Sequence, residues 1–225
     1  MDRSASELAA VAAAVVDCRR CPRLVAWREE VGRTKRAAFR TSRYWARPVP
    51  GFGDPDAAIV IVGLAPAAHG ANRTGRVFTG DRSGDWLFAA LHRAGLANQP
   101  TSEHAGDGLR LRRAWVTAAV KCAPPANRPE PAERDACAPY LDTELATLSP
   151  RAVVCLGAFG YDAAARAYAL RPRPRFGHGV EAVVPDGPTL VCSYHPSQQN
   201  TFTGRLTEPM LDAVLARAVA VADVC

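Results

Sequence analysis

Four short apolar runs recur along the chain, separated by longer segments in which apolar positions have helical spacing. A continuous apolar run is typical of a strand that is buried on both faces. Strands that alternate with helices favour a parallel sheet with helices packed on both sides. We therefore predict an α/β fold, a three-layer α/β/α sandwich around a central, mostly parallel four-stranded sheet. The expected strands are residues 57–63, 115–120, 152–157 and 189–194, and the expected helices are residues 84–95, 131–148, 158–169 and 206–223.

The region before the first strand has a different character. Residues 5–17 are rich in Ala and Val and predict a helix. Residues 28–53 combine arginines and aromatic residues with several Pro and Gly, so we expect no more than an ordered loop there. We expect one domain over residues 1–225, with residues 1–53 packed on it as a helix followed by a basic, aromatic extension.

The composition supports one core and a basic surface. Of the 225 residues, 48% are hydrophobic, which suits a single domain. The net charge is +6, and all basic residues except Lys35 and Lys121 are arginines, whose planar fork binds phosphate. This favours a nucleic-acid partner, although a bias in base composition would also enrich arginine. We find no apolar run long enough for a membrane span and no clear secretion signal, and we expect a cytoplasmic protein.

Four of the seven cysteines form two pairs with the character of a metal or cluster site. Cys18 and Cys21 are a CxxC pair, whereas Cys122 follows the second predicted strand and Cys137 lies in the next predicted helix. Thiolates spaced in this way bind zinc or an iron–sulfur cluster, and the spacing alone leaves both open. An odd number of cysteines without a secretion signal argues against a disulfide framework.

Three loops of unusual composition follow predicted strands, at residues 63–81, 121–129 and 193–200. The carboxyl ends of parallel strands meet at one edge of a sheet, and ligands bind at that edge. The first loop carries the large aromatic Phe78, which can stack on a planar base or fill the core beneath the loop. Asn127 in the second loop and His195 in the third can each bind a ligand or serve the structure alone. Their convergence on one edge favours a ligand site.

The residues of these loops resemble a known family. GLAPAAHGANRTGRVFTGD at 63–81, KCAPPANRP at 121–129 and HPSQQN at 195–200 are similar to the uracil-DNA glycosylase superfamily, and more narrowly to its family 5, or UDGb, type. The resemblance covers roughly residues 15–215. It implies an enzyme that hydrolyses the N-glycosidic bond of uracil in DNA, and of other deaminated bases such as hypoxanthine and xanthine, leaving an abasic site. We expect a monomer that acts on nucleoid DNA.

The resemblance also implies a structural 4Fe–4S cluster, which would tie the N-terminal extension to the sheet. Its expected ligands are Cys18, Cys21, Cys122 and Cys137. The first loop lacks the polar residue that many superfamily members use to direct water, because Leu64 and Ala65 occupy the corresponding positions. Asp81 is our candidate for that role, with Asp85 as the second choice.

We assign three groups of site residues on this basis. A base is extruded from the duplex into a pocket before its glycosidic bond is cut. The expected catalytic residues are Asp81, Asn127 and His195. The expected substrate-binding residues are Gly63, Ala65, Phe78, Asn127 and His195. The expected DNA-binding residues are Arg73, Arg128, Ser197, Gln198, Gln199 and Asn200.

Three other classes of protein stay open at this stage. The first is an iron–sulfur protein that binds damaged DNA without turnover, which the apolar first loop makes plausible. The second is a redox protein that uses its cluster directly, and the third is a zinc-stabilised nucleotide hydrolase of similar α/β build.

Overall fold

The fold is built around a six-stranded mixed sheet with the strand order β1-β3-β2-β4-β6-β5. It is seen in a computed structural model that describes residues 3–223. The four predicted strands are confirmed as its parallel centre: β2 (Ile59–Gly63), β3 (Ala114–Ala118), β4 (Ala152–Leu156) and β6 (Thr189–Ser193). The edges are the antiparallel strands β1 (Phe52–Gly53) and β5 (Glu181–Val183).

The prediction of four strands was therefore too low by two. Both edge strands are too short, at two and three residues, to show a hydrophobic pattern. The ladder partner of β1 lies far away in the sequence, since Phe52 pairs with Val116, so tertiary context decides this strand. Strand β5 instead forms a local hairpin with β6, in which Ala182 pairs with Leu190.

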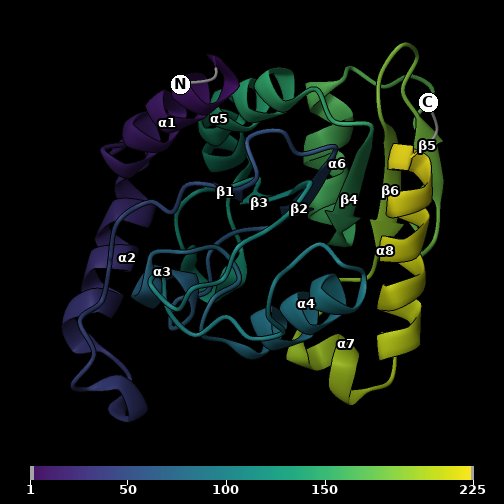
Figure 1. Ribbon diagram of the computed structural model, residues 1–225. Coiled ribbons are helices and arrows are strands. Elements are labelled where there is room, and N and C mark those ends of the chain that lie inside the picture. Colours follow the sequence, from purple (N-terminus) through teal and green to yellow (C-terminus); the bar gives the residue numbers. More distant parts are fainter. Residues whose placement is uncertain (1–2, 224–225) are drawn as a thin grey trace.

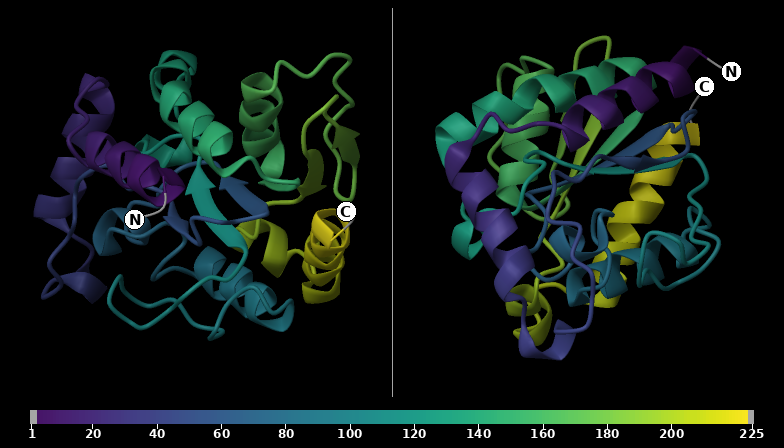
Figure 2. Two further views of the ribbon diagram at one scale, coloured as in Figure 1. Left: turned by 45° about the horizontal axis from the view of Figure 1, so that its top comes forward. Right: turned by 90° about the vertical axis from the view of Figure 1, so that its left-hand side faces the viewer.

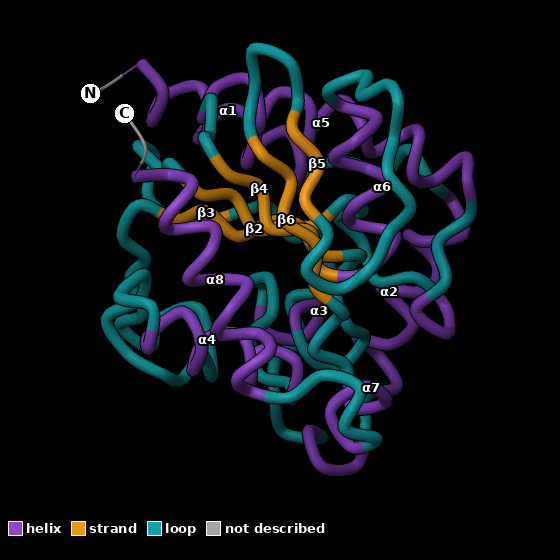
Figure 3. The backbone as a smooth tube through the Cα atoms, turned by 90° about the vertical axis from the view of Figure 1, so that its right-hand side faces the viewer, coloured by secondary structure: helices purple, strands orange, loops and turns teal. Residues whose placement is uncertain are grey.

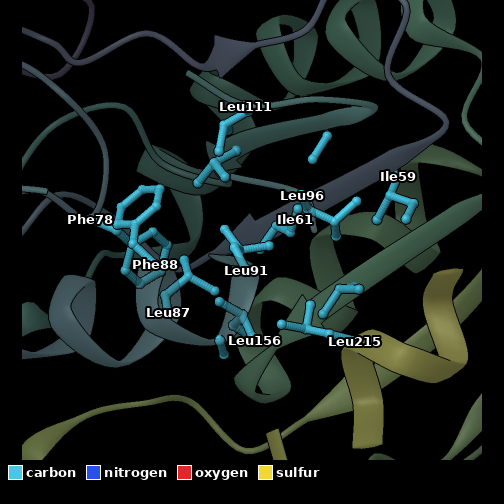
Figure 4. Close-up of a cluster of buried hydrophobic side chains, with 14 of the residues drawn as sticks. Ile59, Ile61, Phe78, Leu87, Phe88, Leu91, Leu96, Leu111, Leu156 and Leu215 are labelled. Atoms are coloured by element: carbon cyan, nitrogen blue, oxygen red, sulfur yellow. The ribbon is translucent and has the colours of Figure 1, made fainter. Parts of the chain in front are cut away.

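Helices cover both faces of the sheet, which confirms the three-layer arrangement (Figures 2 and 3). On one face, Ile59 and Ile61 of β2 belong to a core cluster with α4 and α8, part of which is shown in Figure 4. On the other face, Val60 and Val62 pack in a cluster with α1, α5 and α6. The helices are α1 (Arg3–Val16), α2 (Pro22–Thr34), α3 (Ala71–Thr74), α4 (Arg82–Arg93), α5 (Pro131–Leu148), α6 (Gly157–Ala167), α7 (Gln198–Phe202) and α8 (Glu208–Asp223), with short 3-10 turns at Ala37–Phe39 and Pro125–Asn127.

Helix α2 corrects the expectation of a loop over residues 28–53, because its second half falls in that range. Pro22 occupies its first turn, where a missing backbone N–H costs nothing. Leu24 and Val31 lie on its buried face, together with Arg28, whose side chain is 2% exposed. A charged residue on the apolar face breaks the helical pattern in the sequence, which is why the helix was missed.

The segment after α2 is attached to the first of the three predicted site loops. The backbone N–H of Trp45 donates to the carbonyl of Arg73 at 3.0 Å, and that of Ala46 donates to the carbonyl of Asn72 at 2.9 Å. The buried Asn72 side chain donates in turn to the carbonyl of Arg28 in α2 at 3.2 Å. The N-terminal extension therefore holds the backbone of the site loop in place.

No helix within residues 3–223 combines the length and the apolar character that crossing a membrane requires.

Candidate active site

The three predicted loops meet around one pocket of about 430 Å³ at the carboxyl edge of the parallel strands. Eight of the predicted site residues line it, whereas Gly63, Arg73, Gln198 and Asn200 do not. The lining residues are Leu64, Ala65, Ala67, Phe78, Asp81, Ser83, Ala126, Asn127, Arg128, His195, Ser197 and Gln199. The structure thus brings together residues that are up to 135 positions apart in the chain, from Leu64 to Gln199.

Phe78 forms one wall of the pocket and also belongs to the core cluster beside Phe88 (Figure 4). The interpretation that Phe78 fills the core beneath the loop is therefore confirmed, and stacking on a planar base stays a prediction. Its ring lies 5.7 Å from the ring of His195, centroid to centroid. A Cβ on Gly63 would lie 2.6 Å from the Phe78 ring, so only glycine at the end of β2 lets the ring approach the strand. Gly63 does not line the pocket, but it sets the position of the aromatic wall.

Asp81 faces the pocket and caps a helix at the same time. It is the N-cap of α4, and its side chain accepts a hydrogen bond from the backbone N–H of Gly84 at 3.1 Å. Burial raises the pKa of the Asp81 carboxyl, while the amides of Gly84 and Ser83 oppose that shift. Asp85, our second choice, is exposed in the first turn of α4 and does not line the pocket. The geometry favours Asp81 over Asp85.

His195 lies against Phe78 at the end of β6. Burial lowers the pKa of its imidazole to about 4, so the ring is neutral at neutral pH. A neutral imidazole keeps one N–H donor. The amide nitrogen of Asn200 donates to the carbonyl oxygen of His195 at 2.8 Å and fixes the loop backbone. Asn200, predicted to bind DNA, thus has a structural contact inside the loop.

Asn127 stands at the pocket mouth on a tight turn. It and Ala126 both have left-handed backbone conformations, with φ of 54° and 51°. Asn tolerates this region better than most residues, which explains its place in the turn. Its backbone N–H donates to the carbonyl of Pro124 at 3.2 Å, so the turn that brings Asn127 to the pocket is closed.

Arg73 is placed differently from the other predicted DNA-binding residues. Its guanidinium donates to the carbonyls of His69 and Gly80, both at 2.8 Å, and stacks on Phe39 at 4.0 Å. These contacts brace the first loop from within. A contact of Arg73 with DNA stays a prediction.

The predicted cluster ligands line a second, separate cavity. Cys18, Cys21, Cys122 and Cys137 all carry free thiols and line one small cavity together with Arg28 and Lys121. Arg28 donates to Cys122 Sγ at 2.9 Å. Burial raises the pKa of the Cys122 thiol to about 12. Burial also raises the pKa of Cys21 and Cys137.

These cysteines do not form a site for a single ion. Within residues 3–223, no three or more His, Cys, Asp or Glu side chains are placed so that they could hold one metal ion. Lys121 also lines the cavity, but its ammonium donates instead to Thr117 Oγ1 at 2.6 Å and to Glu144 Oε2 at 2.7 Å. The guanidinium of Arg28 is therefore the buried cation that directly faces a cysteine sulfur.

Sequence reasoning missed several pocket walls. Ala67 and Ser83 line the cavity because the first loop folds back through α3 before α4 begins. The signal for Ser83 was its place two residues after Asp81, in the first turn of the helix that Asp81 caps. Small residues such as Ala67 give no such signal.

Comparison with known proteins identifies the family. The sequence model of the Uracil DNA glycosylase superfamily matches residues 50–218. The chain belongs to the uracil-DNA glycosylase superfamily. Within that superfamily it belongs to the type-5 group, as the three loop motifs predicted.

Three similar proteins carry the name type-5 uracil-DNA glycosylase. The protein of Mycobacterium tuberculosis is 56% identical over 211 residues, which cover 92% of this chain and 79% of that protein. The protein of Mycobacterium leprae is 55% identical, covering 92% of both chains. The protein of Thermus thermophilus is 54% identical, covering 89% of this chain and 92% of its own. The similarity to type-5 uracil-DNA glycosylases thus extends into the N-terminal extension, which the superfamily model does not match.

Proposed function

We propose that this protein is a monofunctional hydrolase that removes uracil from DNA and leaves an abasic site. The observation that carries the proposal is that Phe78, Asp81, Asn127 and His195 line one pocket of about 430 Å³. These residues supply a planar aromatic wall, a carboxylate, an amide and a neutral imidazole. A base extruded from the duplex needs such a stacking surface and hydrogen-bonding groups for its polar edge.

Each side chain has a separate task in the reaction. Phe78 stacks on the extruded base, and Asn127 hydrogen-bonds its polar edge. His195, neutral because burial lowers its pKa, donates to the base carbonyl on which negative charge develops. Asp81 accepts a hydrogen bond from water as the water oxygen bonds to the sugar carbon. The glycosidic electron pair leaves with the base as an anion, the sugar gains the hydroxyl group, and the Asp81 carboxylate takes up the proton that the water loses.

We infer that the enzyme also accepts hypoxanthine and xanthine. Leu64 and Ala65 line the pocket in place of the polar residue that directs water in many superfamily members, which leaves more room for the base. Apolar walls reject other bases weakly, because they contain no buried donor or acceptor that a wrong base would leave unpaired. Base choice then rests on Asn127 and on the size of the cavity.

Two proposals, the removal of uracil and the acceptance of hypoxanthine and xanthine, can be tested together. The substrates are oligonucleotides that carry one of the three bases, as single strands and in duplexes. We expect free base to be released and alkali to cleave the strand at the abasic site. Binding without release of any base would favour the alternative, a DNA-damage-binding iron–sulfur protein without turnover. Release of uracil but not hypoxanthine from duplexes would contradict the broad specificity alone.

We infer that Cys18, Cys21, Cys122 and Cys137 would hold a structural 4Fe–4S cluster. The four free thiols line one cavity, and the buried guanidinium of Arg28 lies where it would offset the negative charge of thiolate ligands. Such a cluster would supply cross-links between α2, the end of β3 and α5.

All the residues of the proposed site come from one chain, and we infer that the protein acts on nucleoid DNA as a monomer.

A further inference from the structure

Phe202, at the end of α7, is a large aromatic side chain that is 67% exposed to solvent. No other Phe, Tyr or Trp within residues 3–223 is exposed to this extent, and the next, Trp45, is 36% exposed. An aromatic ring in water forgoes the stabilisation that burial gives. The position therefore calls for a partner that covers the ring.

Phe202 belongs to the short helix that contributes two residues to the pocket lining. Ser197, the N-cap of α7, and Gln199, in its first turn, both line the pocket, and Phe202 follows Gln199 by three residues. Residues three apart are neighbours on a helix surface. Figure 1 shows α7 beside the start of α4, so the ring lies where the first and third site loops meet.

The guanidinium of Arg82 covers this ring at 4.8 Å from its centroid. Arg82 lies between Asp81 and Ser83, which line the pocket, and its own side chain points to solvent. It takes part in no salt bridge or side-chain hydrogen bond within residues 3–223. An exposed cation–π pair of this kind is weak, so a better partner for either member can separate the two.

Base extrusion creates such a partner at the pocket mouth. When one nucleotide leaves the duplex, its neighbours lose a stacking surface. An aromatic side chain can replace it for any sequence, because every base has a flat face. A guanidinium released from the ring can bind a phosphate, which suits its planar fork.

We propose that Phe202 is a stacking platform for a nucleobase outside the pocket, and that Arg82 exchanges the ring for a backbone phosphate when DNA binds. The proposal rests on the proposed function, since it assumes that extruded nucleotides enter the adjacent pocket. It adds two residues to the interface that the three sequence motifs did not point to.

Binding to a duplex with a tetrahydrofuran abasic analogue tests the platform. We expect Phe202→Ala to weaken binding about tenfold, equivalent to about 1.4 kcal/mol. Phe202→Trp should bind within twofold of the wild type, because it keeps the aromatic face. Val183→Ala is the matched control, since Val183 is 69% exposed on the edge strand β5 and does not line the pocket. Binding by Phe202→Ala within twofold of the wild type would overturn the proposal.

A 2-aminopurine next to the analogue reports stacking directly. We expect its fluorescence to be quenched by the wild type and by Phe202→Trp, but not by Phe202→Ala at saturating protein. Equal quenching by all three proteins would show that no base stacks on this ring.

The salt dependence of the same binding tests the exchange of Arg82. We expect the slope of log Kd against log salt to fall by about one for Arg82→Met, because each phosphate contact contributes about 0.9. Phe202→Ala should keep the wild-type slope. An unchanged slope for Arg82→Met would mean that Arg82 reaches no phosphate.

These measurements use an analogue that releases no base. If the wild-type protein bound the analogue through Phe202 but left uracil in place, the proposed function would fail and the platform would stand. If uracil were released but Phe202→Ala bound normally, only the platform would fail.

Discussion

Gly63 shows how one missing side chain shapes the pocket. The ring of Phe78 packs directly against Gly63, and a Cβ on Gly63 would lie only 2.6 Å from the nearest ring atom. The Phe78 backbone is held on the other side as well, since a Cβ on Gly84 would lie 1.9 Å from the carbonyl oxygen of Phe78. The aromatic wall therefore has little room to move.

We expect Gly63→Ala to lower uracil excision more than tenfold by pushing the Phe78 ring into the cavity. Overpacking of this kind destabilises a protein by about 1–3 kcal/mol, which denaturant unfolding would measure. Gly106→Ala is the control, because a Cβ there meets nothing closer than 3.7 Å. A variant of Gly63 with normal excision would show that the ring position does not matter.

We expect His195→Ala to slow excision by about a hundredfold or more, the usual loss for one donor aimed at developing charge. His92, exposed on α4, gives a control substitution to Ala. If His195→Ala stayed within threefold of the wild type, the role given to His195 would be wrong.

The pH dependence of His195 follows from its pKa of about 4. The imidazole should stay neutral from pH 8 down to about pH 5, so the His195-dependent part of the excision rate should be level across this range. Stability should change at the acid end. Between pH 6.5 and 4 the unfolded chain takes up a proton that the folded chain does not, so folding weakens as the pH falls through this window. Unfolding of wild type and His195→Ala at several pH values would measure the difference.

At this scale the sequence predicted which residue types meet, but not all their contacts. Phe78, Asn127 and His195 were found because unusual residues followed strand ends. The internal hydrogen bonds of Arg73 could not be foreseen, because they depend on where His69 and Gly80 are placed in three dimensions.

Helix α4 depends on the same carboxylate that faces the pocket. Asp81 accepts the hydrogen bond from Gly84 at the first turn, where the helix has unpaired backbone donors. Capping and catalysis can be separated because Asn caps a helix about as well as Asp.

We expect Asp81→Asn to keep its unfolding free energy within about 0.5 kcal/mol of the wild type and to lose excision at least a hundredfold. Asp81→Ala should lose excision to the same extent, and its unfolding free energy should also fall by about 1 kcal/mol because the helix cap is gone. Thermal unfolding and single-turnover excision, with Asp85→Asn as the control, would measure both. Full activity in Asp81→Asn would leave this side chain with the capping role alone.

Among the elements, the sequence predicts best where one pattern runs over many residues. Helix α5 has the predicted bounds, 131 to 148. Two of the failures have distant partners, because β1 pairs with β3 and α2 buries Arg28 against the cysteine cavity. No local pattern carries that information. Strand β5 was missed for another reason: it forms a hairpin with β6 but is only three residues long.

In the whole molecule, the four-cysteine cavity joins parts of the chain that are 119 residues apart, from Cys18 to Cys137. We expect the purified protein to be brown and to contain about four irons per chain. Cys137→Ser should lose iron and lower Tm by about 10 °C, or about 3 kcal/mol at about 2–4 °C per kcal/mol. Cys192→Ser is the control, because Cys192 is buried in β6 away from the cavity. One zinc per chain, or no metal, would contradict the cluster.

The hydrogen bonds from Trp45 and Ala46 to the first site loop have a consequence for how such enzymes can be recombined. The superfamily sequence model matches from residue 50 onward, yet the loop that forms one side of the pocket is held by residues before that position. A chimera that joined this sheet to the N-terminal segment of a distant relative would keep every motif residue and still misplace Phe78 and Asp81. An exchange of the N-terminal segment must therefore preserve the backbone at residues 45 and 46 and also the Trp45 side chain, whose indole N–H donates to the carbonyl of Pro48 at 2.9 Å.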